Sequence, residues 1–185
     1  MTIETTESQF GYISRVAMPI YHPRTSWTSA YQGNLGTGFA TAIGAKVAHP
    51  DKQVPSINGD GGFMYNVQEL ATAVKYNIPV VAIVFADGAD GNVRRIQQEL
   101  NDNRIIGSNL TNPDFVALAE SLGCAAYRVE TPEEMAKILP EAFKQPVLTV
   151  IEVPFPPTPD PWSVIMLRRN RPAAYFLIIG LSLVF

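Results

Sequence analysis

An unbroken apolar run near the middle of the chain limits the possible folds more than any other feature. Residues 79–85 (PVVAIVF) carry no polar side chain, which is typical of a strand buried on both faces of a parallel sheet. Further strands are predicted at 54–57, 125–129 and 146–153. Helices are predicted around these strands at 36–48, 66–76, 92–100, 113–122 and 131–143. The alternation predicts an α/β fold with three layers, in which helices cover both faces of a parallel sheet.

Two of the predicted helices begin with capping signals. Thr131, followed by Pro132 and Glu134, fits a capping box, in which the threonine hydroxyl and the glutamate carboxylate satisfy free N–H groups of the first turn. Asn112 stands directly before Pro113 and is predicted to cap the helix at 113–122.

The length of 185 residues suits one domain with its own core. We place this domain at residues 13–153, after a polar N-terminal tail over 1–12. A proline-rich extension follows over 154–172, and an apolar tail occupies 173–185. A membrane-spanning helix needs about 20 apolar residues, and the apolar tail is shorter. We therefore interpret it as a terminal appendage rather than a membrane anchor.

Composition and charge argue against several functional classes. Hydrophobic residues make up 46% and charged residues 17% of the chain, as in ordinary globular proteins. The net charge of −3 offers no basic surface for nucleic acid. The single cysteine, Cys124, excludes an internal disulfide framework and a zinc site built from several cysteines. Met1–Gln9 fits neither a signal peptide nor a basic transit peptide, so a cytoplasmic protein is expected.

Two glycine-rich turns each follow a predicted buried strand. They are NGDGG at 58–62 and DGADG at 87–91. One helix and one strand separate the turns, so both are expected at the carboxyl edge of the sheet. Asp60 and Asp87 would then lie close together, and two carboxylates repel each other unless a cation stands between them. Oxygen ligands suit Mg²⁺ shared with phosphates, and the start of the helix at 92–100 suits a phosphate. The turns therefore predict a site for a metal and a diphosphate.

The two turns and their surroundings resemble the thiamine-diphosphate motif of the acetolactate synthase and benzoylformate decarboxylase superfamily. The resemblance covers about residues 11–162 and includes NVQELATAVKYNIPVVAIVF and the following GNVRR. It implies that the side chains of Asp60 and Asp87 and the main-chain carbonyl of Ala89 bind Mg²⁺. Two diphosphate oxygens and a water molecule would complete the octahedron. It also implies that N–H groups around three glycines hold the diphosphate: Gly61, Gly62 and Gly91.

The segment QGNLG at 32–36 resembles the part of the family that grips the aminopyrimidine ring. At the position of Leu35 the family has a bulky apolar side chain that keeps the cofactor in a V shape. The carbonyl of Gly33 would accept a hydrogen bond from the 4′-amino group. The resemblance implies a lyase or transferase that acts on 2-oxo acids by decarboxylation or carboligation.

No residue of the chain matches the glutamate that, in this family, protonates the N1′ atom of the pyrimidine. That glutamate belongs to a separate N-terminal pyrimidine-binding domain, usually of a neighbouring subunit. The resemblance therefore implies that this chain carries no catalytic residue. It also implies a homo-oligomer, or a second chain that supplies the pyrimidine-binding domain.

The chain departs from the family pattern at three positions. Ala86 replaces the usual asparagine, and Asp90 adds a third carboxylate. Ile96 stands where acetolactate synthases that accept a second 2-oxo acid carry a tryptophan, which argues against acetohydroxyacid synthesis. Two alternatives stay open. One is a truncated, non-catalytic fragment that still binds the cofactor, and the other is a dinucleotide-binding domain, suggested by GTG at 36–38 but with Thr41 in place of the third glycine.

Overall fold

A parallel sheet of six strands forms the centre of the computed structural model, which describes residues 3–5, 11, 13–14, 18–28 and 33–154. The strand order is β2-β1-β3-β4-β6-β5, and every neighbouring pair is parallel. The strands are β1 (Ile3–Thr5), β2 (Ser26–Thr28), β3 (Pro55–Gly59), β4 (Val81–Ala86), β5 (Ala125–Arg128) and β6 (Thr149–Pro154).

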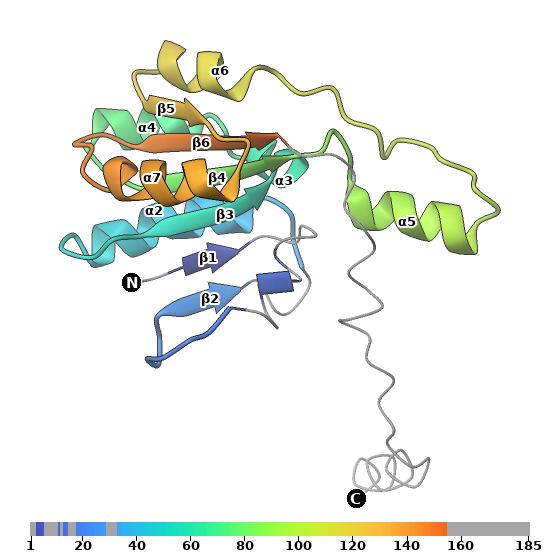
Figure 1. The fold of residues 1–185 in the computed structure, drawn as a ribbon, viewed down its shortest axis with the longest axis horizontal. Coiled ribbons are helices and arrows are strands. Elements are labelled where there is room, and N and C mark those ends of the chain that lie inside the picture. The colour runs from blue at the N-terminus through green and yellow to red at the C-terminus, as the bar shows by residue number, and fades with distance from the viewer. Residues whose placement is uncertain (1–2, 6–10, 12, 15–17, 29–32, 155–185) are drawn as a thin grey trace, which may run out of the picture.

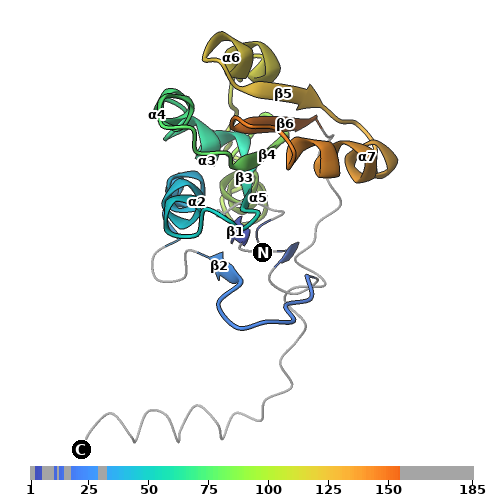
Figure 2. The same ribbon diagram turned by 90° about the vertical axis from the view of Figure 1, so that its left-hand side faces the viewer.

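Helices cover both faces of this sheet, as Figures 1 and 2 show. They are α2 (Thr37–Ala48), α3 (Asp60–Met64), α4 (Glu69–Lys75), α5 (Gly91–Leu100), α6 (Phe115–Ser121) and α7 (Pro132–Ala142). Helix α5 lies beyond the carboxyl ends of the strands, away from the sheet (Figure 1), and none of its residues is buried. The α/β fold with a parallel sheet and helices on both faces is confirmed.

The side chains of β4 alternate between two apolar clusters, one on each face of the sheet. Ala82 and Val84 pack in the cluster that includes buried residues of α2, α4 and α6. Val81 and Ile83 pack in the other cluster, with residues of α7. Because both faces are covered, β4 is apolar throughout its buried length, as its sequence indicated.

Three aromatic side chains join the first cluster to the short helix α3. Phe63 lies on α3, with its ring centroid 5.0 Å from that of Phe39 on α2 and 5.9 Å from that of Phe115 on α6. All three side chains are fully buried. They fix α3, and with it Asp60 at its first position, against the core.

Three elements were not predicted from the sequence: β1, β2 and α3. The prediction that residues 1–12 form a polar tail is wrong for Ile3–Thr5, which pair with β2 on one side and β3 on the other. Main-chain hydrogen bonds hold such a short strand, and they require no apolar pattern.

The predicted capping box of α7 is confirmed in its main part, whereas the predicted cap of α6 is wrong. Thr131 Oγ1 accepts a hydrogen bond from the N–H of Glu134 at 3.2 Å. At α6 the cap is Asp114, whose side chain accepts from the N–H of Ala117 at 2.9 Å. Helix α6 begins at Phe115, two residues later than predicted, so Asn112 lies before the cap position. Its amide donates instead to a carboxylate on another element, described below.

Within the described residues, no helix is long and apolar enough to cross a membrane. The predicted proline-rich extension, apart from its first residue Pro154, and the apolar tail at 173–185 lie outside the described residues.

We expect Phe63→Ala to lower the free energy of unfolding by about 3–5 kcal/mol, because it removes a large buried ring and leaves a cavity. Urea denaturation followed by circular dichroism measures the change. Val47→Ala, on the exposed side of α2, serves as a control and should change the value by less than about 0.5 kcal/mol. A loss below about 1 kcal/mol for Phe63→Ala would contradict the role of this ring in fixing α3.

Candidate functional site

The two glycine-rich turns meet at the carboxyl ends of β3 and β4. These strands are parallel neighbours, and Gly59, the last residue of β3, is paired with Phe85 in β4. Asp60 directly follows β3 and begins α3, and Asp87 directly follows β4. The prediction that both turns lie at one edge of the sheet is therefore confirmed.

The carboxylate of Asp60 is the centre of the hydrogen bonding at this edge. The residue is 2% exposed. Its Oδ1 accepts from the N–H of Gly61 at 2.8 Å, and its Oδ2 accepts from the N–H of Gly88 at 2.8 Å and from Nδ2 of Asn112 at 2.6 Å. A buried carboxylate requires such donors in place of water. The bond to Gly88 joins the first turn directly to the second.

Two further carboxylates lie near Asp60, and both have pKa values above the ordinary range. Burial is the main cause of the raised pKa of Asp87, and the negative charge of Asp60 adds to it. The same two causes, in the same order, raise the pKa of Asp90. A Cβ atom added at Gly61 would lie 2.8 Å from Oδ1 of Asp90, so this side chain points toward the first turn. Negative charge therefore accumulates here, and a cation would stabilise the ionised forms.

The basic residue Arg94, on helix α5, acts on this cluster. The charge of Arg94 lowers the pKa of Asp87, although burial and Asp60 outweigh it. Its neighbour Arg95 instead forms an ion pair with Glu99 at 2.6 Å on the same helix.

The main chain of the second turn offers a further oxygen. Ala89 is buried and pairs with Asn109 in an isolated antiparallel bridge. Its N–H donates to Oδ1 of Asp87 at 3.2 Å. None of the hydrogen bonds between described residues ends on its carbonyl oxygen. A main-chain carbonyl that accepts none of these hydrogen bonds is an oxygen that a metal ion can use.

In the described part of the chain, no three side chains of His, Cys, Asp or Glu form a group that could hold a metal by themselves. The predicted ligand set is of a different kind, because it combines two carboxylates with the carbonyl of Ala89.

Helix α5 begins at the same edge, directly after Asp90. The N–H groups of its first turn, at Gly91 and the two residues after it, have no acceptor within the helix. The positive end of the helix dipole adds to their attraction for an anion. On the first turn, the N–H of Gly61 is already donated to Asp60, whereas Gly62 is buried at the start of α3.

The segment predicted to grip an aminopyrimidine ring lies beside the residues that follow α3. Gly33 and Leu35 are half-buried in the loop that enters α2. Asn66 Nδ2 donates to the carbonyl of Gly36 at 2.6 Å. Gly36 has a φ of 84°, and a Cβ atom there would come within 2.7 Å of the Tyr65 Cβ, so only glycine fits. Gln32 lies outside the described residues.

Sequence analysis missed Asn112 as a site residue. Its acceptor, Asp60, lies 52 residues away in the chain, and no periodic or turn pattern indicates such a contact. The one available signal was a polar side chain in a long loop that returns to the carboxyl edge of the sheet.

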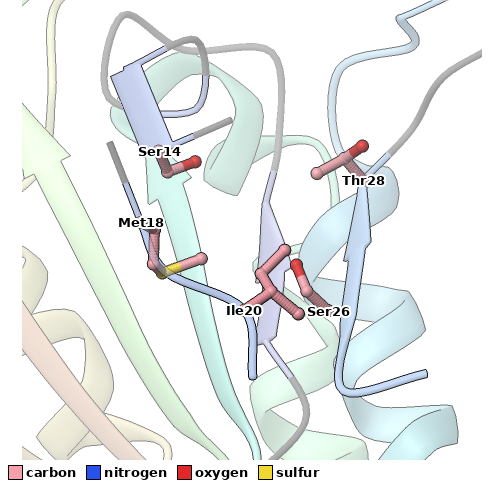
Figure 3. A pocket seen from close by; sticks show the side chains of 5 residues that line it. All are labelled: Ser14, Met18, Ile20, Ser26 and Thr28. Carbon is pink, nitrogen blue, oxygen red and sulfur yellow. The ribbon is translucent and has the colours of Figure 1, made fainter. Parts of the chain in front are cut away.

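A cavity of about 230 Å³ lies beside β2, the strand at one edge of the sheet. Figure 3 shows its lining residues, which are Ser14, Met18, Ile20, Ser26 and Thr28. None of the residues predicted to bind a metal or a cofactor is among them.

Known proteins are similar to this chain in sequence and in fold. The chain is 47% identical over 122 residues to a probable acetolactate synthase large subunit of Methanococcus aeolicus, a match that covers 65% of this chain and 20% of that protein. It is 39% identical over 126 residues to the acetolactate synthase large subunit of Haemophilus influenzae, covering 68% and 22%. The chain thus spans about a fifth of the length of these curated relatives.

A solved structure is similar to this chain in both fold and sequence. The thiamine diphosphate-dependent 4-hydroxybenzoylformate decarboxylase of Rhodococcus jostii superposes with a TM-score of 0.74 and 31% sequence identity, over 85% of this chain and 30% of that one. The model of the family described as "Thiamine pyrophosphate enzyme, C-terminal TPP binding domain" matches residues 8–153. This match favours a thiamine-diphosphate domain over the dinucleotide-binding alternative. The chain belongs to the thiamine pyrophosphate enzyme family and carries its C-terminal TPP binding domain.

Proposed function

We propose that this chain binds thiamine diphosphate through Mg²⁺, as the C-terminal module of an enzyme that decarboxylates or ligates 2-oxo acids. The observation that carries the proposal is the meeting of Asp60 and Asp87, with Ala89 in the same turn as Asp87, at the carboxyl ends of β3 and β4. The family membership and the acetolactate synthase relatives support the cofactor and the substrate class.

The chemistry of these three oxygens suits Mg²⁺. The charge of Asp60 raises the cost of ionising Asp87, and a divalent cation between the two carboxylates would offset that cost. The Ala89 carbonyl adds a neutral oxygen ligand. Mg²⁺ is usually held by one or two carboxylates together with phosphate oxygens and water, so three protein oxygens leave room for a diphosphate in an octahedral shell.

The other predicted residues would hold the rest of the cofactor. The N–H groups of Gly62 and Gly91, at the starts of α3 and α5, would donate to diphosphate oxygens. Gly61 allows the close approach of the first turn because it carries no Cβ. Gly33 would accept from the aminopyrimidine, and Leu35 would hold the two rings in a V shape. When bound, thiamine diphosphate supplies a nucleophilic carbon and an electron sink for the reaction of a 2-oxo acid.

The complete enzyme needs a pyrimidine-binding domain, which we propose is supplied by a further part of the same protein or by a partner subunit. The curated relatives are about five times as long as the matched segment, which supports a multidomain enzyme. Ile96 on α5 favours decarboxylation, or ligation of a simple acceptor, over acetohydroxyacid synthesis.

We expect Asp60→Ala and Asp87→Ala each to abolish Mg²⁺-dependent binding of thiamine diphosphate. Each variant removes one of the three protein ligands, and Asp60→Ala also breaks the bond that joins the two turns. Asp87→Asn should keep much of the binding, because an amide oxygen can still ligate the metal. Isothermal titration with thiamine diphosphate, with and without Mg²⁺, measures these affinities.

The control for lost negative charge is Glu120→Ala, on the exposed surface of α6, which should bind as the unaltered chain does. Tight, Mg²⁺-dependent binding by Asp60→Ala would refute the proposed metal site.

We further expect the 185-residue polypeptide, saturated with cofactor and Mg²⁺, to release no carbon dioxide from pyruvate or benzoylformate. A site that positions the cofactor provides proximity, but the family resemblance places the acid that activates the pyrimidine in a separate domain. Proton–deuterium exchange at C2 of the bound cofactor, followed by NMR, should therefore run near its rate in free solution. Fast exchange would mean that a group of this chain, such as Glu69 or Asp90, activates the cofactor.

A further inference from the structure

The two carboxylate oxygens of Asp60 receive different numbers of hydrogen-bond donors. An ionised carboxylate offers about four acceptor positions, two on each oxygen. Oδ2 receives two donors, the N–H of Gly88 at 2.8 Å and Nδ2 of Asn112 at 2.6 Å, whereas Oδ1 receives the N–H of Gly61. Oδ2 is therefore saturated, and Oδ1 keeps one position for another partner.

The donor on Asn112 is held in place from both sides. On its N-terminal side, residues 108–110 run along the second turn, with Asp90 N–H donating to the Ser108 carbonyl at 2.9 Å and Leu110 N–H to the Gly88 carbonyl at 2.8 Å. On its C-terminal side, Pro113 restricts residue 112 to extended backbone, and Asp114 caps α6. The amide of Asn112 thus reaches Asp60 from a fixed main chain.

We propose that Asn112 is a positioning residue that occupies Oδ2 of Asp60 and so assigns Oδ1 to the metal. Without this donor, each oxygen would keep one donor, from Gly61 or from Gly88, and either oxygen could bind the metal. The metal then binds a less ordered ligand. Asn112 also links Asp60 on the first turn to the second turn, which carries the other ligands, because its own segment is bonded to residues 88 and 90. This inference rests on the proposed metal site and adds a residue that does not touch the metal.

Asn112→Ala tests the inference, with Mn²⁺ as the probe. The free Mn²⁺ signal in electron paramagnetic resonance measures metal affinity, first with Mn²⁺ alone and then with thiamine diphosphate added. We expect Asn112→Ala to weaken Mn²⁺ binding by about 10- to 100-fold, as is typical when a residue that orients a metal ligand is removed. If this variant does not fold, Asn112→Leu fills a similar volume, also lacks the donor, and is judged in the same way.

Ser108→Ala is the matched control, because it loosens the same segment without touching Asp60. Ser108 Oγ donates to Gln97 Oε1 at 2.7 Å, so its loss removes one of the hydrogen bonds between the segment and α5. Thermal melting of both variants measures the structural effect separately. The inference requires that Ser108→Ala bind Mn²⁺ within about twofold of the unaltered chain.

Four other outcomes overturn one proposal or the other. Equal Mn²⁺ affinity in Asn112→Ala and the unaltered chain, or an equal loss in Ser108→Ala, would reduce Asn112 to a loop anchor. Mn²⁺ binding that thiamine diphosphate does not strengthen would refute the proposed cofactor. The Mn²⁺ affinities of Asn112→Ala and Ser108→Ala would then still decide the role of Asn112. No Mn²⁺ binding by the unaltered chain would overturn both.

Discussion

A carboxylate that is only 2% exposed has lost its water, and protein donors must replace it. Asp60 obtains three of them from three parts of the chain: the start of α3, the turn after β4, and the loop before α6. The donor at Gly61 directly follows Asp60 in the chain, but those at Gly88 and Asn112 reach it only if β3 and β4 are parallel neighbours and the loop returns to the same edge. The geometry of the whole site therefore depends on satisfying this one side chain.

Charge is the second constraint at this edge. The raised pKa values of Asp87 and Asp90 come from burial and from the charge of Asp60. The charge of Arg94 lowers the pKa of Asp87, which offsets these two effects only in part. Ionised carboxylates in this arrangement destabilise the folded chain until a cation joins them. The burial that makes the ionised carboxylates unfavourable therefore also favours the binding of a divalent ion. In this way the stability of the fold is linked to the proposed binding of Mg²⁺ and diphosphate.

The core and the site share the short helix α3. Its first residue, Asp60, supplies the carboxylate, and Phe63, one turn later, packs between rings from α2 and α6. A helix of this length has little stability of its own, so packing of the phenyl ring holds the carboxylate in place. Helix α5, in contrast, contributes its first turn to the site while none of its residues is buried in the described chain.

The sequence by itself determined the α/β class, the central strands, most helices and the pair Asp60 and Asp87, because buried strands and amphipathic helices leave periodic patterns and the carboxyl ends of neighbouring parallel strands must meet. Tertiary structure alone decided that Ile3–Thr5 is a strand and that Asn112 serves Asp60 rather than α6. Both depend on main-chain or side-chain donors that pair across large separations, 52 residues in the second case. A polar side chain can find several acceptors close to it in the sequence. Only the assembled fold brings a buried acceptor from elsewhere within hydrogen-bond distance, and leaving that acceptor unpaired would cost more free energy than leaving an exposed one unpaired.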